Sequence, residues 1–112
     1  MPKNYKITFA VPGKLKKELS EKVIRDGYGF RGKSKWVSEE VGNLLQLKSF
    51  PSLVNYSDEM SGFDEMETSV VDYQLKLKLD EAILQVRKEF PTLEGVTSRI
   101  MRTAILQRLL RS

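Results

Sequence analysis

Hydrophobic and polar side chains alternate in a short segment near the start of the chain. The larger apolar side chains are Tyr5, Ile7, Phe9 and Val11, and between them stand Lys6, Thr8 and Ala10. Alternation with a period of two predicts a β-strand over residues 5–11 with one buried face. Pro12 and Gly13 end the strand, because proline cannot donate to a sheet and suits the first turn of a helix.

The pattern then changes to a helical period. Leu15, Leu19 and Val23 are spaced four apart, which predicts an amphipathic helix over residues 14–26. The following segment DGYGFRGK contains three glycines and predicts a turn. Ser34 is placed as the N-cap of a second helix, whose apolar face holds Trp36, Val37, Val41, Leu44 and Leu45. The first part of the chain therefore reads strand, helix, turn, helix.

The last part of the chain repeats this order. Leucines 75, 77 and 79 alternate with Gln74, Lys76 and Lys78, which predicts a second strand over residues 73–79. Asp80 is expected to cap the next helix, and the segment PTLEG at 91–95 should end it. Thr97 is the expected N-cap of a last helix. Placing Pro12 against Asp80 superposes the two halves with an offset of 68 residues.

Residues 49–67 form an acidic connector between the halves. This segment holds five acidic side chains and no lysine or arginine. Its aromatic residues Phe50, Tyr56 and Phe63 favour packing on the surface, and its polar composition equally fits a disordered linker. We expect a first unit over 1–48, the connector over 49–67 and a second unit over 68–112, together forming one compact domain.

Pairing the two strands is the economical solution for their backbones. A lone strand leaves N–H and C=O groups unpaired at both edges, and a two-stranded ribbon is stable only with helices on one face. The expected fold is mostly α-helical with a two-stranded antiparallel β-ribbon. Its uncovered face would carry Lys6, Thr8 and Ala10 beside Gln74, Lys76 and Lys78.

Composition argues against several classes of protein. The chain of 112 residues has no cysteine and no histidine, so a thiol nucleophile, the commonest general base and the commonest transition-metal ligand are missing. We expect no catalytic residues, no metal site and no cofactor, and hence not an enzyme. The apolar runs are too short to span a bilayer, and the start of the chain does not resemble a signal peptide. A cytoplasmic protein without a membrane partner is expected.

Charge favours a polyanionic partner. The net charge of +4 combines the acidic connector with two basic units. A two-stranded ribbon fits the DNA major groove, where lysine donates to guanine, glutamine pairs with adenine, and threonine serves either role. Helices that begin near Ser34 and Thr97 would offer free N–H groups to the flanking phosphates.

Several segments resemble the ribbon-helix-helix (Arc/MetJ/CopG-type) family of DNA-binding proteins. ITFAVPGKLKKEL and LKLKLDEAI are similar to its ribbon and first helix, and GKSKWVSEEVGNLL and GVTSRIMRTAILQRLL to its turn and second helix. Because both halves lie in one chain, the resemblance implies a tandem ribbon-helix-helix pseudo-dimer, similar to the TraY type of conjugative plasmids. It implies double-stranded DNA as the partner, with further copies of the chain or a relaxase beside it. The role would be transcriptional regulation (a repressor) or relaxosome accessory function.

The resemblance also implies individual contacts. The base-contacting positions would be Lys6, Thr8, Ala10, Gln74, Lys76 and Lys78, and the phosphate-contacting positions Ser34, Lys35, Thr97 and Ser98. Ala10 departs from the family pattern, because that position is usually polar or basic.

Other interpretations stay open from the sequence. Ser34 and Thr97 also suit plain helix capping, Lys14, Lys16 and Lys17 suit a solvated helix face, and Trp36 suits the core. The alternative function is a protein-interaction or antitoxin-like module whose basic surface does not read DNA.

Overall fold

The computed structural model describes residues 4–29, 31–57, 62 and 65–110. Two strands and five helices follow one another along this part of the chain: β1 (Asn4–Val11), α1 (Gly13–Arg25), α2 (Lys33–Leu45), α3 (Phe50–Ser57), β2 (Glu65–Asp72), α4 (Tyr73–Glu89) and α5 (Val96–Leu110). The expected class, mostly helical with a two-stranded antiparallel sheet, is confirmed. No helix of the described ranges is long and apolar enough to cross a membrane.

The ribbon uses a different second strand from the one predicted. β1 pairs with β2, so Tyr5 lies opposite Val71, Thr8 opposite Thr68 and Val11 opposite Glu65. The prediction of a strand over residues 73–79 is wrong, because these residues form the start of α4. The predicted first strand is confirmed.

Residues 73–79 are helical because their apolar side chains continue a helical stripe. Leu75 is half-buried, and Leu79, Ala82 and Val86 are buried, at spacings of four, three and four residues. Leu77 lies off this stripe and is 45% exposed. The side chain of Asp72 caps the helix by accepting a hydrogen bond from the Leu75 N–H at 2.8 Å. Asp80, the predicted cap, lies inside α4 and pairs with Lys76.

The true second strand is obscured in the sequence by polar residues on its inner face. Glu67 and Ser69 point inward and are buried, where the matching positions of β1 carry apolar side chains. Lys33 neutralises Glu67 through a contact of 2.8 Å between its Nζ and the carboxylate Oε1. β2 begins at Glu65, inside the segment predicted as connector.

The connector is partly structured. Its first part forms α3, where Phe50, Pro51 and Val54 are buried. Of the two alternatives left open by the sequence, residues 50–57 therefore pack on the rest of the protein. Phe63 lies outside the described residues, and the side chain of Tyr56 is likewise not described.

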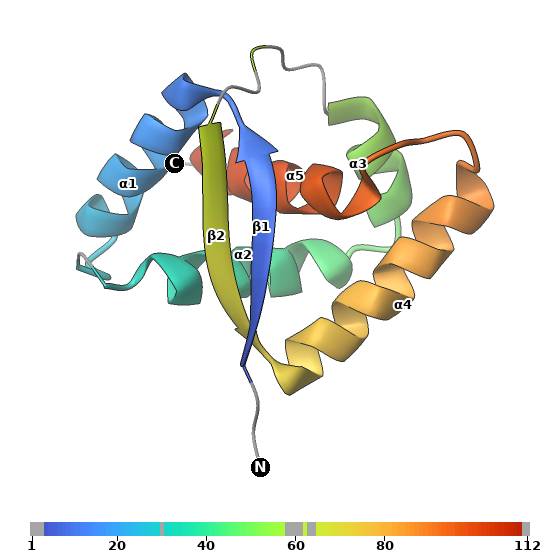
Figure 1. Ribbon diagram of the computed structural model, residues 1–112, viewed down its shortest axis with the longest axis horizontal. Helices are drawn as coiled ribbons and strands as arrows, with labels where there is room; N and C mark the ends of the chain where they lie inside the picture. Colours follow the sequence, from blue (N-terminus) through green and yellow to red (C-terminus); the bar gives the residue numbers. More distant parts are fainter. Residues whose placement is uncertain (1–3, 30, 58–61, 63–64, 111–112) are drawn as a thin grey trace.

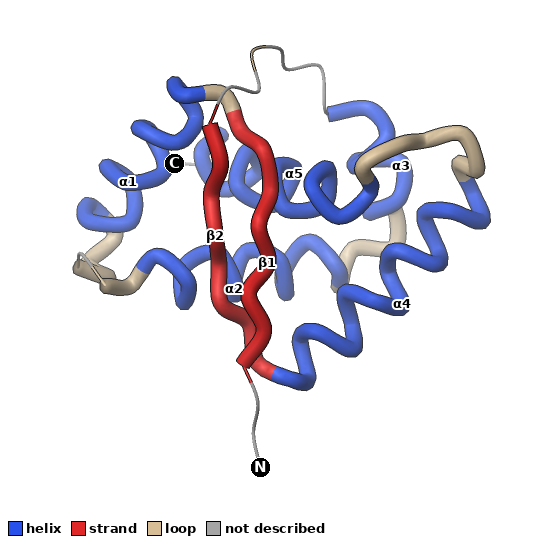
Figure 2. The backbone as a smooth tube through the Cα atoms, in the orientation of Figure 1, coloured by secondary structure: helices blue, strands red, loops and turns tan. Residues whose placement is uncertain are grey.

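The helices cover one face of the ribbon (Figures 1 and 2). α2 and α5 cross behind the two strands, and α1 and α4 lie to either side. The core between them is centred on Phe9, Trp36, Val37, Ile100 and Ile105, all 1% exposed or less. The prediction that Trp36 belongs to the core is confirmed.

The order strand, helix, helix occurs twice, as β1-α1-α2 and β2-α4-α5. The offset between corresponding positions of the strands and first helices is 60 residues rather than the predicted 68. With this offset Thr8 matches its partner Thr68, and buried Leu19 matches buried Leu79. The predicted helices after Pro12 and around 34–45 are confirmed, as is the break at 91–95.

The helix boundary at Asp72 can be tested against Asp80 as a matched control. Asp72→Ala removes the cap of α4 and should lower the free energy of unfolding by about 1 kcal/mol in a urea titration. Asp80→Ala removes an exposed ion pair within the helix and should cost less than about 0.5 kcal/mol. A larger loss for Asp80→Ala would contradict the observed start of α4.

Candidate nucleic-acid interface

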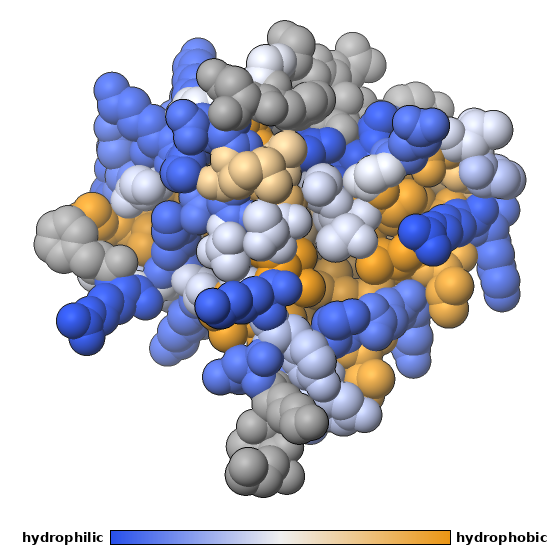
Figure 3. Space-filling view, viewed as in Figure 1, coloured by the Kyte–Doolittle hydropathy of each residue, from blue (hydrophilic) through white to orange (hydrophobic). Residues whose placement is uncertain are grey.

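The face of the ribbon opposite the helices is open. Eight side chains of the described strands β1 and β2 point outward from it. Asn4 and Asp72 form the pair at one end, and the remaining six are Lys6, Thr8 and Ala10 of β1, and Met66, Thr68 and Val70 of β2. Ala10 and Val70 are partly exposed, and the other four are exposed. Figure 3 looks onto this face, whose middle is mostly pale to orange, with blue hydrophilic side chains around it.

Apart from Asn4 and Asp72, the outward side chains form three cross-strand pairs. Thr8 and Thr68 stand at the centre, with their Oγ1 atoms 3.1 Å apart in a hydrogen bond. Lys6 faces Val70 toward one end, and Ala10 faces Met66 toward the other. These three pairs therefore carry one cation, two hydroxyl groups and three apolar side chains, and the end pair adds the Asn4 amide and the Asp72 carboxylate that caps α4.

The predicted base-contacting residues are only partly brought together. Lys6, Thr8 and Ala10 lie on the open face as expected. The placement of Gln74, Lys76 and Lys78 on the ribbon is wrong, because all three belong to α4. The ammonium of Lys76 pairs with Asp80 at 2.6 Å and lies 5.9 Å from the centre of the Tyr5 ring.

Sequence reasoning missed Met66, Thr68 and Val70. The signal that could have found them is the β-branched run Thr68, Val70 and Val71 directly before the capping residue Asp72. The polar inner residues of the strand outweighed that signal.

Side chains satisfy backbone groups along both outer edges of the ribbon. The Ser34 hydroxyl accepts from the Val70 N–H at 2.9 Å, and the Ser38 hydroxyl donates to the Val70 carbonyl at 3.3 Å. Lys16 donates to the carbonyl of Met66, and Arg102 to that of Ala10, each at 2.8 Å. These four backbone groups are therefore unavailable for pairing with another strand.

The structure corrects three expectations about single residues. Ser34 was predicted as an N-cap, but Gly32 holds that position and Ser34 lies in the first turn of α2. Thr97 likewise lies inside α5, which begins at Val96. Lys16 is not a purely solvated side chain, because it also lies 3.9 Å from Glu65, whereas Lys14 and Lys17 are exposed.

The starts of α2 and α5 flank the ribbon on opposite sides (Figure 1). In α2 the Trp36 N–H donates to the Gly32 carbonyl at 2.9 Å, so the N–H groups of residues 33–35 precede this bond. In α5 the corresponding bond joins the Arg99 N–H to the Gly95 carbonyl at 3.0 Å. Lys35 is exposed, and Ser34, Thr97 and Ser98 are partly exposed. Phosphate contact by these four residues stays a prediction.

Close packing fixes where α2 begins. A Cβ atom at Gly32 would collide with the backbone and Cβ of Tyr28, so only glycine fits beside the turn. Any larger residue would push the first turn of α2 away from Tyr28.

A charged cluster joins the end of α1 to α2 and α5. The Asp26 carboxylate accepts from the Trp36 indole N–H at 2.8 Å, and it lies 3.2 Å from Lys22 and 3.4 Å from Arg108. The Trp36 hydrogen bond chiefly lowers the pKa of Asp26, with help from Lys22 and Arg108 and against the effect of burial. Arg108 also approaches Glu40 at 3.7 Å.

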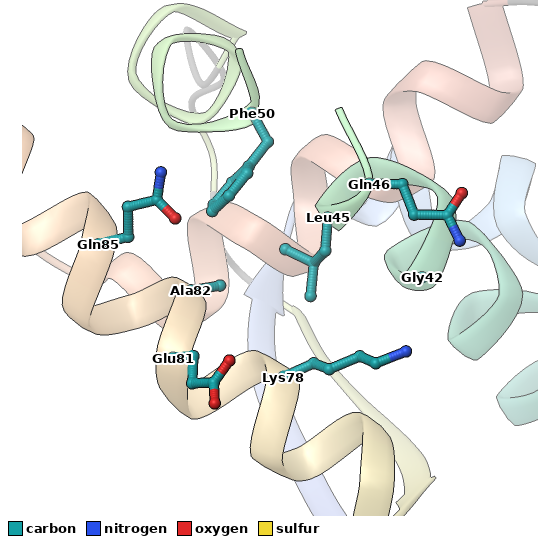
Figure 4. A pocket seen from close by; sticks show the side chains of 8 residues that line it. All are labelled: Gly42, Leu45, Gln46, Phe50, Lys78, Glu81, Ala82 and Gln85. Carbon is teal, nitrogen blue, oxygen red and sulfur yellow. The ribbon is translucent and has the colours of Figure 1, made fainter. Parts of the chain in front are cut away.

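A hollow of about 210 Å³ between α2, α3 and α4 is a weaker candidate site (Figure 4). Leu45, Phe50 and Ala82 supply its apolar wall, and Lys78 extends across it from α4 toward α2. Its volume is below the range of ~300–1,000 Å³ usual for ligand pockets. Within the described residues no group of three acidic, histidine or cysteine side chains could hold a metal ion.

The Asp26 cluster predicts a pH-dependent stability difference. Because the folded pKa of Asp26 lies below its ordinary value of 3.8, the carboxylate stabilises the fold above about that pH, and this is lost as the pH falls through the folded pKa. Asp26→Asn should lower the free energy of unfolding by about 1 kcal/mol at pH 7, since hydrogen bonds to a charged group are the stronger ones. Urea titrations from pH 7 to pH 3 should show this difference shrinking below about pH 4. A constant difference would contradict the role of the charge.

Comparison of the chain with protein-family models, curated proteins and solved structures gives no match.

Proposed function

We propose that the chain is a sequence-specific, double-stranded DNA-binding protein that inserts the β1–β2 ribbon into the major groove. The observation that carries this proposal is the open ribbon face, flanked on both sides by the starts of α2 and α5. A two-stranded ribbon fits the major groove, which is ~12 Å wide. No catalytic step is part of the proposal.

The open face carries side chains that suit base edges. Lys6 can donate to guanine O6 or N7, and the hydroxyl groups of Thr8 and Thr68 can donate or accept. These side chains rise from a hydrogen-bonded strand pair whose inner face is packed on the core. The reading groups therefore stand on a rigid support, which lowers the entropy cost of binding.

The flanks suit the sugar-phosphate backbone. The first N–H groups of α2 and α5 carry the positive end of each helix dipole. Lys35 adds an exposed cation at the start of α2, and Lys14 and Lys17 add two more on α1. Contacts of this kind set affinity and register and carry no sequence information.

The repeated order of elements supports a single-chain pseudo-dimer. In the ribbon-helix-helix proteins that the sequence resembles, two subunits each contribute one strand to the ribbon. Here β1 and β2 come from one chain and pair about Thr8 and Thr68, sixty residues apart. We propose that one chain does the work of such a dimer, with its second unit beginning at Glu65.

A salt titration tests DNA binding itself. Contact with about six phosphates should give a slope near −5 in a plot of log affinity against log salt concentration, measured by fluorescence anisotropy on a duplex. A protein-interaction module with a merely solubilising basic surface would bind the duplex weakly at low salt and not at about 0.15 M salt, and that result would overturn the proposal.

Substitution of Lys6 distinguishes recognition of a base from general attraction to DNA. Lys6→Ala should weaken binding to the preferred duplex by roughly 1–3 kcal/mol and change binding to unrelated duplexes much less. Lys88→Ala is the matched control, because it removes the same charge from an exposed position in the last turn of α4. Equal losses on all duplexes for Lys6→Ala would make Lys6 a phosphate contact instead.

A further inference from the structure

We infer that the ribbon reads thymine methyl groups with Ala10, Met66 and Val70 and guanine with Lys6, so that the protein binds an A·T-rich site in a fixed orientation. The inference rests on the proposed function and names the class of DNA sequence that the same face selects. It follows from the chemistry of the three cross-strand pairs other than Asn4 and Asp72.

Three outward side chains have no hydrogen-bonding group. Ala10 and Met66 form one pair, and Val70 stands beside Lys6; Met66 is 55% exposed. The major groove presents one apolar feature, the C5 methyl group of thymine. Placing these side chains against the polar edge of a G·C pair would remove water from that edge without replacing its hydrogen bonds. Thymine is therefore the base that these three positions favour.

Among the eight outward side chains, the Asp72 carboxylate is the one anion, and it caps α4 by accepting from the Leu75 N–H. Lys6 is the only cation among them. It is exposed, and no ion pair of Lys6 occurs within the described part of the chain. Its ammonium is free to donate to guanine O6 and N7 at its end of the ribbon.

The central threonine pair discriminates less. Because one hydroxyl donates its hydrogen to the other across 3.1 Å, the pair retains one O–H donor together with its acceptor lone pairs. Such a pair can form hydrogen bonds with the edges of several different bases. Discrimination is therefore left to the outer positions.

The outer positions differ in symmetry. Rotation about the centre of the ribbon exchanges Lys6 with Met66 and Ala10 with Val70. Ala10 and Val70 are both apolar and suit thymine in both halves of a site. Lys6 favours a guanine, whereas Met66 favours a thymine. The two halves of the preferred site therefore differ in sequence, and the protein binds it in one orientation.

The first arm of the test uses thymine-to-uracil replacement. The preferred duplex is obtained by selecting from a randomised library with the full chain, and each thymine in it is then replaced by uracil, which removes only the methyl group. Loss of a contacted methyl should weaken binding about fourfold, the effect of exposing one buried carbon. Uracil outside the protected segment is the control and should have no effect.

The second arm measures orientation. The chain has no cysteine, so Ser20→Cys on the exposed side of α1 gives one attachment point for an iron-chelate DNA-cleaving group. Cleavage should fall on one side of the guanine. The double variant Lys6→Met with Met66→Lys keeps composition and net charge and should move cleavage to the other side.

The outcomes separate the inference from the proposed function. Duplex binding without uracil sensitivity, or with cleavage equal on both sides, overturns the inference and leaves DNA binding standing. Absence of duplex binding overturns both. If the double variant does not fold, the uracil arm and the cleavage pattern of the Ser20→Cys chain decide alone.

Discussion

The pairing of β1 with β2 is the contact on which the rest of the structure depends. Among the residues that the structure describes, neither strand has a further strand beside it, so each satisfies one backbone edge through the other. Side chains meet groups on the remaining edges: Ser34 and Ser38 bind Val70, and Arg102 binds Ala10. Because the helices cover one face of the ribbon, the other face is open to a partner.

The sequence predicts the first half well because its signals agree. In β1 the inner side chains are all apolar, and Pro12 and the glycine-rich turn mark the boundaries. In the second half Leu75 and Leu79 fit both a strand and a helix, since positions four apart share a face in either. Glu67 and Ser69 hide the true strand, because their burial depends on Lys33 and on core packing that local sequence does not reveal.

The observed second strand gives the candidate site a different chemistry from the predicted one. The face predicted from residues 73–79 would have added glutamine and two lysines, whereas the observed face adds Met66, Thr68 and Val70. Positive charge is thereby concentrated on the flanks, where it suits phosphates, and the ribbon keeps a single lysine. A face of this composition discriminates bases more through methyl contacts than through charge.

The burial of Glu67 helps to fix the position of α2 relative to the ribbon. Burying a carboxylate is costly, and its Oε2 atom has no hydrogen-bond partner within the described residues. Its other oxygen forms an ion pair with Lys33, the first residue of α2. The next residue, Ser34, accepts a hydrogen bond from the N–H of Val70, three residues after Glu67 in β2. Two successive residues thus tie the first turn of α2 to β2. If that turn contacts a phosphate, its position relative to the reading face is set before DNA arrives, and binding does not have to supply the cost of ordering it.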